Sequence, residues 1–436
     1  MEWQLIFLIV ISGLLFLLMT GLPVFAAFLI VDMFGIIFFM GGTGSLPSLI
    51  GSMLGSIGIF TLTPVLLFII MGEVIFLSGM ARKAIDVVER ALKNLPGRLS
   101  LVAVAGSAIF DCLSGSALGT CAMFSSLLLP EMTKRKYSKY MSMGPIMAGS
   151  ALAVIIPPST LAIVLASQAD ISVGKLLIAG FIPGFMVAGF FALFIVISSL
   201  INPAWTPKAQ ENGTDSSSLF MDFLKYLLPL GLIVLSVLGS ILSGIATPTE
   251  ASALGALTSF ILASAYRRLD IRVLLKSTRN CVEIVSMIFM ICAGSVAFSQ
   301  LLAFTGVTRG LVEFVGSLAL PPKMIIGVML IFLILLGTMI DQVSMIMICV
   351  PIFMPIATSL GSDPVWFGLL MLLSITLGLL TPPFGLLLFI IKGVVTKETK
   401  IIDVYYAALP YVAIIVLSLI IILAFPGIAT WLPSLM

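Results

Sequence analysis

Residues 98–136 read RLSLVAVAGSAIFDCLSGSALGTCAMFSSLLLPEMTKRK, and this stretch decides how the chain lies in a membrane. Its apolar part, residues 99–132, lies between two clusters of basic residues, which mark the cytoplasmic side. One helix of this length would measure about 51 Å, too long for a hydrocarbon core of about 30 Å, and two full spans would need about 40 residues and a turn. The stretch therefore predicts a re-entrant helical hairpin with its tip at Ser114-Gly115-Ser116.

The composition extends this interpretation to the whole chain. Of its 436 residues, 60% are hydrophobic and 9% are charged, and the mean hydropathy is +1.26. Soluble domains carry roughly 25% charged residues. The long unbroken apolar segments predict an all-α polytopic membrane protein and exclude a β-barrel. The absence of histidine and of a phosphate-binding loop argues against an enzyme, a bound cofactor and direct use of ATP.

The basic residues also predict the topology. Spans are expected near residues 3–20, 22–40, 56–80, 141–169, 176–200, 224–243, 250–266, 281–305, 365–391 and 404–424. A second hairpin over residues 324–360 then has both ends outside. This arrangement places 19 of the 22 Lys and Arg residues in the cytoplasm and both termini in the periplasm. The polar stretch 202–222 is expected to be a flexible cytoplasmic linker between two halves.

The two halves share an internal spacing. At an offset of 225 residues, Pro23 matches Pro248, Pro130 matches Pro355, and the pair at 157–158 matches the pair at 382–383. Gly79 and Arg82 match Gly306 and Arg309 at an offset of 227. Because the matched elements run in opposite directions, the sequence predicts two inverted repeats, 1–201 and 223–436. Each has about five spans and one re-entrant hairpin, as in many secondary transporters.

Each half is expected to interrupt a helix at membrane depth twice, at a hairpin tip and at a Pro-Pro pair within span 141–169 or 365–391. Proline frees carbonyl oxygens that lipid cannot satisfy. Sodium prefers such oxygens together with Ser and Thr hydroxyls, and helix N-termini attract anions. The alternatives are a kink healed by neighbouring helices and hydroxyls bonded to the preceding turn. The expected sodium-binding residues are Ser114, Gly115, Ser116, Pro157, Gly337, Thr338, Asp341, Thr381 and Pro382.

The substrate is expected at the same breaks. Of the intramembrane acids, Asp341 at the second tip is interpreted as functional because a bound cation would neutralise it. Four others could instead be helix-end caps or subunit contacts, namely Asp111, Glu73, Glu283 and Glu250. No Lys or Arg falls inside either hairpin, so an anionic substrate must be held by hydroxyls, backbone amides and sodium. The expected substrate-binding residues are Ser116, Pro158, Ser159, Thr338, Pro383 and Gly385.

These features resemble the large membrane subunit of tripartite ATP-independent periplasmic (TRAP) transporters, the DctM family, over essentially the whole chain. One departure is Asp111, at a position where a small residue is expected. The motifs that carry the resemblance are Ser114-Gly115-Ser116, Ile155-Ile156-Pro157-Pro158-Ser159, Ala246-Thr247-Pro248-Thr249-Glu250-Ala251, Asp341 with Pro351 and Pro355, and Leu380-Thr381-Pro382-Pro383-Phe384-Gly385.

The resemblance implies a bacterial or archaeal inner-membrane protein of the ion-transporter superfamily, with an elevator-type scaffold and a transport domain. It further implies sodium-driven import of organic acids such as C4-dicarboxylates, sialic acids and other carboxylates or sulfonates. The implied partners are a small four-helix membrane subunit on a separate chain and a soluble periplasmic substrate-binding protein. The main alternative is a self-sufficient sodium-coupled carboxylate carrier or ion exchanger of the same superfamily. An intramembrane enzyme or a channel would be a different class.

Overall fold

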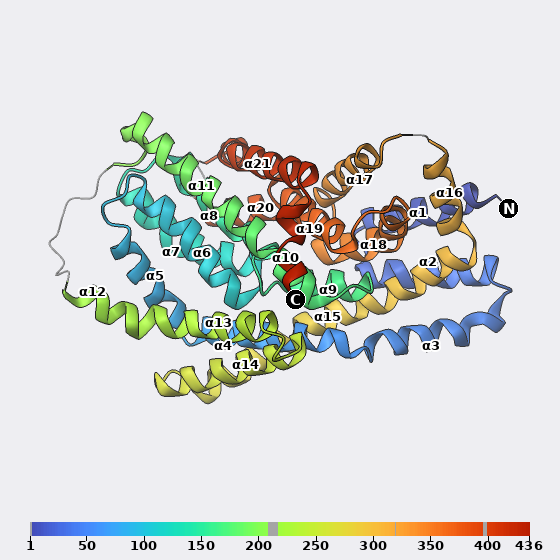
Figure 1. The fold of residues 1–436 in the computed structure, drawn as a ribbon, viewed down its shortest axis with the longest axis horizontal. Coiled ribbons are helices and arrows are strands. Elements are labelled where there is room, and N and C mark those ends of the chain that lie inside the picture. The colour runs from blue at the N-terminus through green and yellow to red at the C-terminus, as the bar shows by residue number, and fades with distance from the viewer. Residues whose placement is uncertain (1, 208–216, 319, 396–398) are drawn as a thin grey trace.

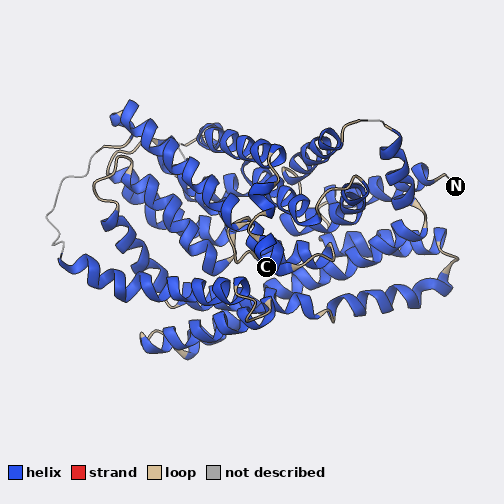
Figure 2. Ribbon diagram, in the orientation of Figure 1, coloured by secondary structure: helices blue, strands red, loops and turns tan. Residues whose placement is uncertain are grey.

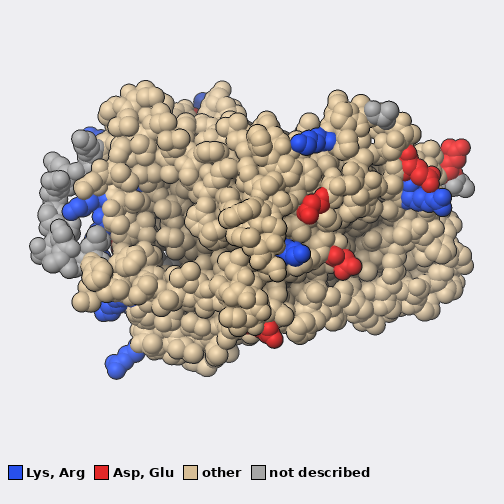
Figure 3. Space-filling view, in the orientation of Figure 1, with Lys and Arg blue, Asp and Glu red and all other residues tan. Residues whose placement is uncertain are grey.

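The computed structural model describes residues 2–207, 217–318, 320–395 and 399–436, and all regular structure in these ranges is helical (Figures 1 and 2). The predicted linker, 202–222, lies partly outside the described residues, from 208 to 216. The described part of the chain carries only scattered Lys, Arg, Asp and Glu side chains on the face shown in Figure 3. The chain is thus an all-helical, multi-pass membrane protein, as its composition predicts.

One group of helices forms an elongated layer along the long axis of the molecule (Figure 1). The 34-residue helix α15 packs against α2, α3 and α4, and α14 packs against α4 and α13. We call this group the layer. Its helices are α2 (Val24–Phe39), α3 (Leu46–Ile57), α4 (Thr63–Leu77), α13 (Leu228–Leu242), α14 (Pro248–Ala265) and α15 (Ile271–Phe304).

A second group, which we call the core, lies beside the layer and contains two helical hairpins and two interrupted helices. The hairpin helices α6 and α17 pack against the interrupted helices that begin with α8 and α19, respectively. The core helices are α6 (Arg98–Ser114), α7 (Ala117–Lys134), α8 (Lys139–Ala151), α9 (Thr160–Gln168), α17 (Pro322–Gly337), α18 (Gln342–Ser359), α19 (Pro364–Leu380), α20 (Leu386–Val394) and α21 (Ile401–Ala424).

The remaining helices connect these groups or flank them. Gly79 and Gly306, with φ of +71° and +74°, directly precede α5 and α16. The flanking helices are α1 (Trp3–Met19), α5 (Met80–Ala91), α10 (Val173–Ala179), α11 (Phe181–Ile201), α12 (Ser217–Asp222), α16 (Val307–Ser317) and α22 (Gly427–Thr430). Short 3-10 turns occur at Thr43–Ser45, Phe60–Leu62, Leu152–Val154, Pro203–Trp205 and Pro433–Leu435, and a π-helical turn at Phe223–Leu227.

Fewer long spans occur than the ten predicted from the sequence. In the described residues, six helical segments are long and apolar enough to cross a membrane, and four further apolar helices have 16 or 17 residues. The predicted span near 56–80 corresponds to Phe60–Leu77, one of these six segments, and its first residues belong to the end of α3, which stops at Ile57 before α4 begins at Thr63. Pro64 at the start of α4 supplies no N–H to a preceding turn, so a new helix starts there.

Candidate transport site

The first hairpin turns over three residues that carry their own turn chemistry. Helix α6 ends at Ser114, and Gly115 follows with φ of +58°, a left-handed conformation that glycine adopts without a Cβ penalty. Ser116 then caps α7, since its hydroxyl accepts from the Gly119 amide at 3.3 Å. The Ser114 and Thr120 hydroxyls lie 3.3 Å apart across the tip. The tip therefore has a hydroxyl at the end of α6, from Ser114, and hydroxyls at the start of α7, from Ser116 and Thr120.

The first tip contacts the first interrupted helix directly. Thr160, the first residue of α9, donates from its hydroxyl to the Gly115 carbonyl at 3.0 Å. A Cβ at Gly115 would lie 3.0 Å from the Thr160 γ-methyl group. Ser159 caps α9 by accepting from the Ala162 amide at 3.3 Å, and its hydroxyl donates to the Val154 carbonyl at 2.8 Å. Tip and break thus form one unit, with Pro157 and Pro158 buried behind it.

The second tip is ordered by different contacts. Thr338, after the end of α17, donates to the Leu335 carbonyl at 2.8 Å. Asp341 caps α18, because its carboxylate accepts from the Ser344 amide at 3.1 Å and from the Ser344 hydroxyl. A Cβ at Gly378 of α19 would lie 2.7 Å from the Gly337 Cα. The backbones of α17 and α19 therefore touch at this pair of glycines.

The second break lies just beyond that contact. Thr381 donates from its hydroxyl to the Leu377 carbonyl at 2.7 Å, and its own carbonyl accepts from the Gly385 amide at 3.2 Å. Tyr405 of α21 donates to the Pro383 carbonyl at 3.0 Å. Pro383 is exposed and Pro382 half-buried. This break consequently links α19, α20 and α21. The Thr381 hydroxyl bonds to the preceding turn, which is one of the two alternatives to sodium binding that the sequence left open.

A cavity of about 170 Å³ lies between the first tip and the layer. First-turn residues of α7, α9 and α18 all line it, including Gly119, Leu161 and Val343. Helix N-termini carry unpaired N–H groups and partial positive charge, and so favour anions. The complete lining is Ile69, Gly72, Glu73, Phe76, Phe110, Ser114, Gly115, Ser116, Ala117, Leu118, Gly119, Thr120, Thr160, Leu161, Ile284, Met287, Ile288, Gln342 and Val343.

Only part of the predicted site meets at this cavity. Ser114, Gly115 and Ser116 line it. The lining residues that sequence analysis did not select include Thr120, Thr160 and the residue after Asp341, Gln342. A usable signal existed for Thr160 and Gln342, which directly follow the caps Ser159 and Asp341, since free amides belong to the first turn after a cap. It did not exist for Thr120, whose amide donates to the Ser116 carbonyl at 3.0 Å. The predicted residues that do not line it are Pro157, Pro158, Ser159, Gly337, Thr338, Asp341, Thr381, Pro382, Pro383 and Gly385.

The intramembrane acids have different surroundings. Glu73 of α4 lines the cavity and accepts from the Asn280 side-chain amide of α15 at 2.8 Å. Glu250 forms a capping box with Thr247 at the start of α14, and Glu283 pairs with Arg279 at 2.8 Å on an exposed surface. Asp111 is fully buried, and neither of its carboxylate oxygens has a hydrogen-bond partner. Glu250 is thus a helix-end cap, as the sequence left open, whereas Glu283 pairs with a residue of its own helix.

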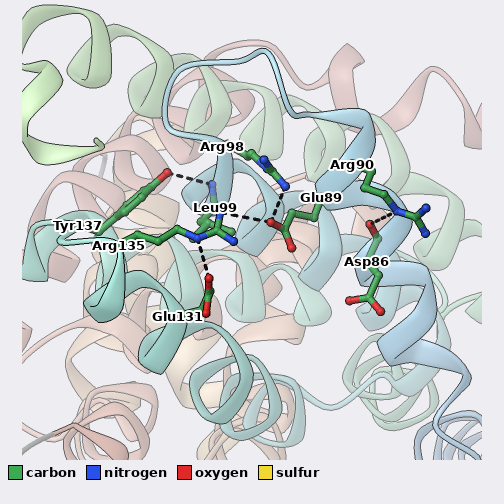
Figure 4. Close-up of polar contacts among 8 residues, drawn as sticks. All are labelled: Asp86, Glu89, Arg90, Arg98, Leu99, Glu131, Arg135 and Tyr137. Carbon is green, nitrogen blue, oxygen red and sulfur yellow. Dashed lines mark hydrogen bonds and ion pairs between the residues drawn. The ribbon is translucent and has the colours of Figure 1, made fainter. Parts of the chain in front are cut away.

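Charged side chains gather at the end of the first hairpin opposite its tip (Figure 4). Glu89 of α5 pairs with Arg98 of α6 at 2.6 Å and with Arg135, next to the end of α7, at 3.4 Å. Arg135 also pairs with Glu131 at 2.7 Å. Burial raises the pKa of the nearby Tyr137 hydroxyl, which stays neutral and accepts from the Leu99 amide at 3.5 Å. These contacts fasten the base of the hairpin to α5.

Hairpins with polar tips, interrupted helices and a cavity at three helix N-termini define a multi-pass membrane transporter. The fold resembles that of the YdaH transporter of Alcanivorax borkumensis, with a TM-score of 0.65 at 14% identity over 89% of this chain and 90% of that one. The sequence profile described as the DctM component of tripartite ATP-independent periplasmic transporters matches residues 11–428. The chain belongs to this family, which confirms the resemblance drawn from its motifs.

Two relatives illustrate the similarity within the family. The C4-dicarboxylate TRAP transporter large permease protein DctM of Pseudomonas aeruginosa is 30% identical over 378 residues, 86% of each chain. The sialic acid TRAP transporter large permease protein SiaM of Vibrio cholerae is 26% identical over 429 residues, 98% of each chain. The chain is accordingly a TRAP transporter permease and not an enzyme.

Proposed function

We propose that the chain is the large permease subunit of a sodium-coupled, binding-protein-dependent importer of organic acid anions. The observation that carries this proposal is the convergence of three helix N-termini on one cavity. Glu73 is the one charged residue in its lining, and no basic side chain contributes to it. Backbone amides and bound sodium would then compensate the charge of a carboxylate or sulfonate. The related permeases named for C4-dicarboxylate and sialic acid support this substrate class.

Sodium binds, in this proposal, at the two tips and the two breaks. The residues at the first tip and break are Ser114, Gly115, Ser116 and Pro157, and those at the second are Gly337, Thr338, Asp341, Thr381 and Pro382. The substrate lies next to the sodium ions and contacts Ser116, Pro158, Ser159, Thr338, Pro383 and Gly385. Hydroxyl and carbonyl oxygens of this kind suit a hard monovalent cation.

The two halves act as inverted repeats with an elevator mechanism. Several matched positions have the same local conformation, which supports the repeat. Gly79 and Gly306 both adopt positive φ before a helix, and Pro130 and Pro355 both lie inside the second helix of a hairpin. Each Pro-Pro pair separates two helices. The layer is the fixed scaffold in this proposal, and the core carries substrate across the membrane.

The chain works in an inner membrane with both termini in the periplasm. Its partners are a small four-helix membrane subunit on a separate chain and a soluble periplasmic binding protein. The family description as a tripartite periplasmic transporter supports this assembly. A self-sufficient carrier would need neither partner, so the partners also provide the test between the two hypotheses.

The test is uptake into proteoliposomes that contain this chain and its small subunit, with the binding protein outside. A panel of C4-dicarboxylates, sialic acid and sulfonates is offered with and without an inward sodium gradient. We expect saturable uptake of one substrate class that requires both sodium and the binding protein. Equal uptake with potassium replacing sodium would contradict sodium coupling. Equal uptake without the binding protein would instead identify a self-sufficient carrier.

A further inference from the structure

Asp111 lies in the last turn of α6 and has no exposed surface. Neither carboxylate oxygen has a hydrogen-bond partner, and no ion pair in the described part of the chain includes this residue. An ionised carboxylate without a partner is strongly disfavoured in such surroundings. Asp111 therefore needs a proton or a bound cation to neutralise it.

The surroundings of Asp111 include two hydroxyl groups, those of Thr120 and Ser107. The Thr120 hydroxyl of α7 and the Ala153 backbone N–H lie close enough to interact with Asp111. One turn earlier on α6, the buried Ser107 hydroxyl also has no partner. A Cβ at Gly149 of α8 would lie 3.0 Å from the Ser107 Cβ, so Ser107 and Asp111 share the face of α6 that packs on α8. Carboxylate and hydroxyl oxygens are ligands for a hard cation.

A route leads from the cavity to this carboxylate. Ser114 and Thr120 both line the cavity, and their hydroxyls are 3.3 Å apart. Thr120 has no exposed surface and reaches from the cavity wall to Asp111. An ion that enters the cavity would thus pass from hydroxyl to hydroxyl toward a buried negative charge. Asp111 itself does not line the cavity.

The second hairpin has its carboxylate at a different position. At the offset of 225 residues, Asp341 corresponds to Ser116, and both residues cap the second helix of their hairpin. Asp111 corresponds to Leu336 at the same offset. The first tip, which is capped by the uncharged Ser116, therefore has the carboxylate of Asp111 one turn earlier. The second tip, which is capped by Asp341, has Leu336 at the matching position. Each tip region carries one carboxylate.

We infer that Asp111, Thr120, Ser114 and Ser107 form a site for one sodium ion behind the first tip, with Asp111 supplying the negative charge. This inference rests on the proposed sodium coupling and adds a buried side-chain carboxylate that the tip residues do not include. The ion neutralises Asp111 and draws α6, α7 and α8 together. Filling of this site then stabilises the tip that borders the cavity.

The test is equilibrium binding of radioactive sodium to the purified complex of this chain and its small subunit. Asp111→Asn keeps the shape of the side chain and removes its charge, so the number of sodium ions bound per complex should fall by one. Thr120→Val removes one hydroxyl ligand, so the sodium concentration for half-saturation of this site should rise about 10-fold. Thr133→Val is the control, because Thr133 lies on the same helix and bonds only to its own preceding turn, at the Leu129 carbonyl.

Unchanged sodium stoichiometry and affinity in Asp111→Asn would overturn the inference. The inference would also be overturned if Asp111→Asn bound sodium as the wild type does but exchanged one proton fewer per transport cycle, because Asp111 would then carry a proton and not bind sodium. If Asp111→Asn does not assemble, the comparison of Thr120→Val with Thr120→Ser tests the inference. Serine keeps the hydroxyl and should keep the sodium affinity, whereas valine lacks the hydroxyl and should lower it. If uptake by the wild-type chain depends on sodium but Asp111→Asn and Thr120→Val bind sodium normally, the inferred Asp111 site is wrong and the proposed function still holds. If uptake by the wild-type chain does not depend on sodium, the proposed sodium-coupled function itself is contradicted.

Discussion

At Gly115 two constraints coincide in one residue. Its φ of +58° disfavours any side chain, and a Cβ there would lie 3.0 Å from the Thr160 γ-methyl group. The first constraint belongs to the turn, and the second to the contact between the first tip and α9. A substitution can separate the two constraints, because Gly79 has the positive φ without a close neighbour.

Gly115→Ala should impair both stability and uptake. The left-handed backbone alone costs about 1–2 kcal/mol with a Cβ, and the methyl group also displaces Thr160 from the tip. Thermal unfolding and initial uptake rates measure the two effects. Gly79→Ala is the matched control, since Gly79 has φ of +71° and a Cβ there would have no neighbour within 4 Å. It should lose similar stability and keep normal uptake, and equal uptake by both variants would contradict a role for the Thr160 contact.

At the scale of elements, the hairpin helices approach the interrupted helices at glycines. Helices α17 and α19 meet at Gly337 and Gly378, where a Cβ on Gly378 would lie 2.7 Å from the Gly337 Cα and 2.9 Å from its carbonyl oxygen. Backbone atoms cannot move aside as a flexible side chain can. This contact sets the position of the second tip relative to the second break.

Gly378→Ala should separate α17 from α19 and destabilise the second tip. We expect a loss of about 1–3 kcal/mol from overpacking and a marked loss of uptake. Thermal unfolding in detergent and the sodium dependence of uptake provide the measurements. Gly327→Ala on α17 is the control, because nothing lies within 4 Å of a Cβ there and alanine favours helix. Wild-type uptake by Gly378→Ala would show that the glycine contact does not position the tip.

Local chemistry explains how much of these elements the sequence could predict. The apolar composition predicts an all-helical membrane protein, and glycine, serine and proline predict where α6, α8, α17 and α19 end, because capping and lost N–H groups act within one turn. The cavity lining could not be predicted in this way. The caps mark Thr160 and Gln342 as first-turn residues, but their meeting with Glu73 at one cavity depends on the packing of α4, α9 and α18, which no local pattern encodes. The re-entrant topology and the sodium ligands stay predictions.

The base of the first hairpin offers a test of how that element is fastened. Glu89→Ala leaves the guanidinium groups of Arg98 and Arg135 without their shared carboxylate, and all three side chains are more than two-thirds buried. We expect a loss of about 1–3 kcal/mol in thermal unfolding. Glu283→Ala breaks the exposed pair with Arg279, where screening leaves at most about 1 kcal/mol. Equal stability of the two variants would mean that the base is held by other contacts.

At the scale of the whole molecule, polar contacts join the core to the layer beside α9. The Gln168 side-chain amide of α9 donates to the Ser295 hydroxyl of α15 at 3.1 Å, and Ser295 donates to the Met347 carbonyl of α18 at 2.6 Å. The hydroxyls of Thr61, just before α4, and Ser167 of α9 lie 2.7 Å apart. These hydroxyls and amides pair across a boundary that an elevator movement would have to break. A covalent link between positions 61 and 167 would therefore prevent movement of the core relative to the layer.

A disulfide between Thr61→Cys and Ser167→Cys, in a chain without its five natural cysteines, should stop transport. The hydroxyl oxygens that the two sulfurs replace are already 2.7 Å apart, so the bond needs little rearrangement. Oxidation should abolish uptake in proteoliposomes, and a reductant should restore it, because α9 could no longer move past the segment before α4. Each single-cysteine variant, treated identically, controls for oxidation itself. Full uptake with complete cross-linking would contradict movement of the core against the layer and require a transport cycle in which α9 stays in place.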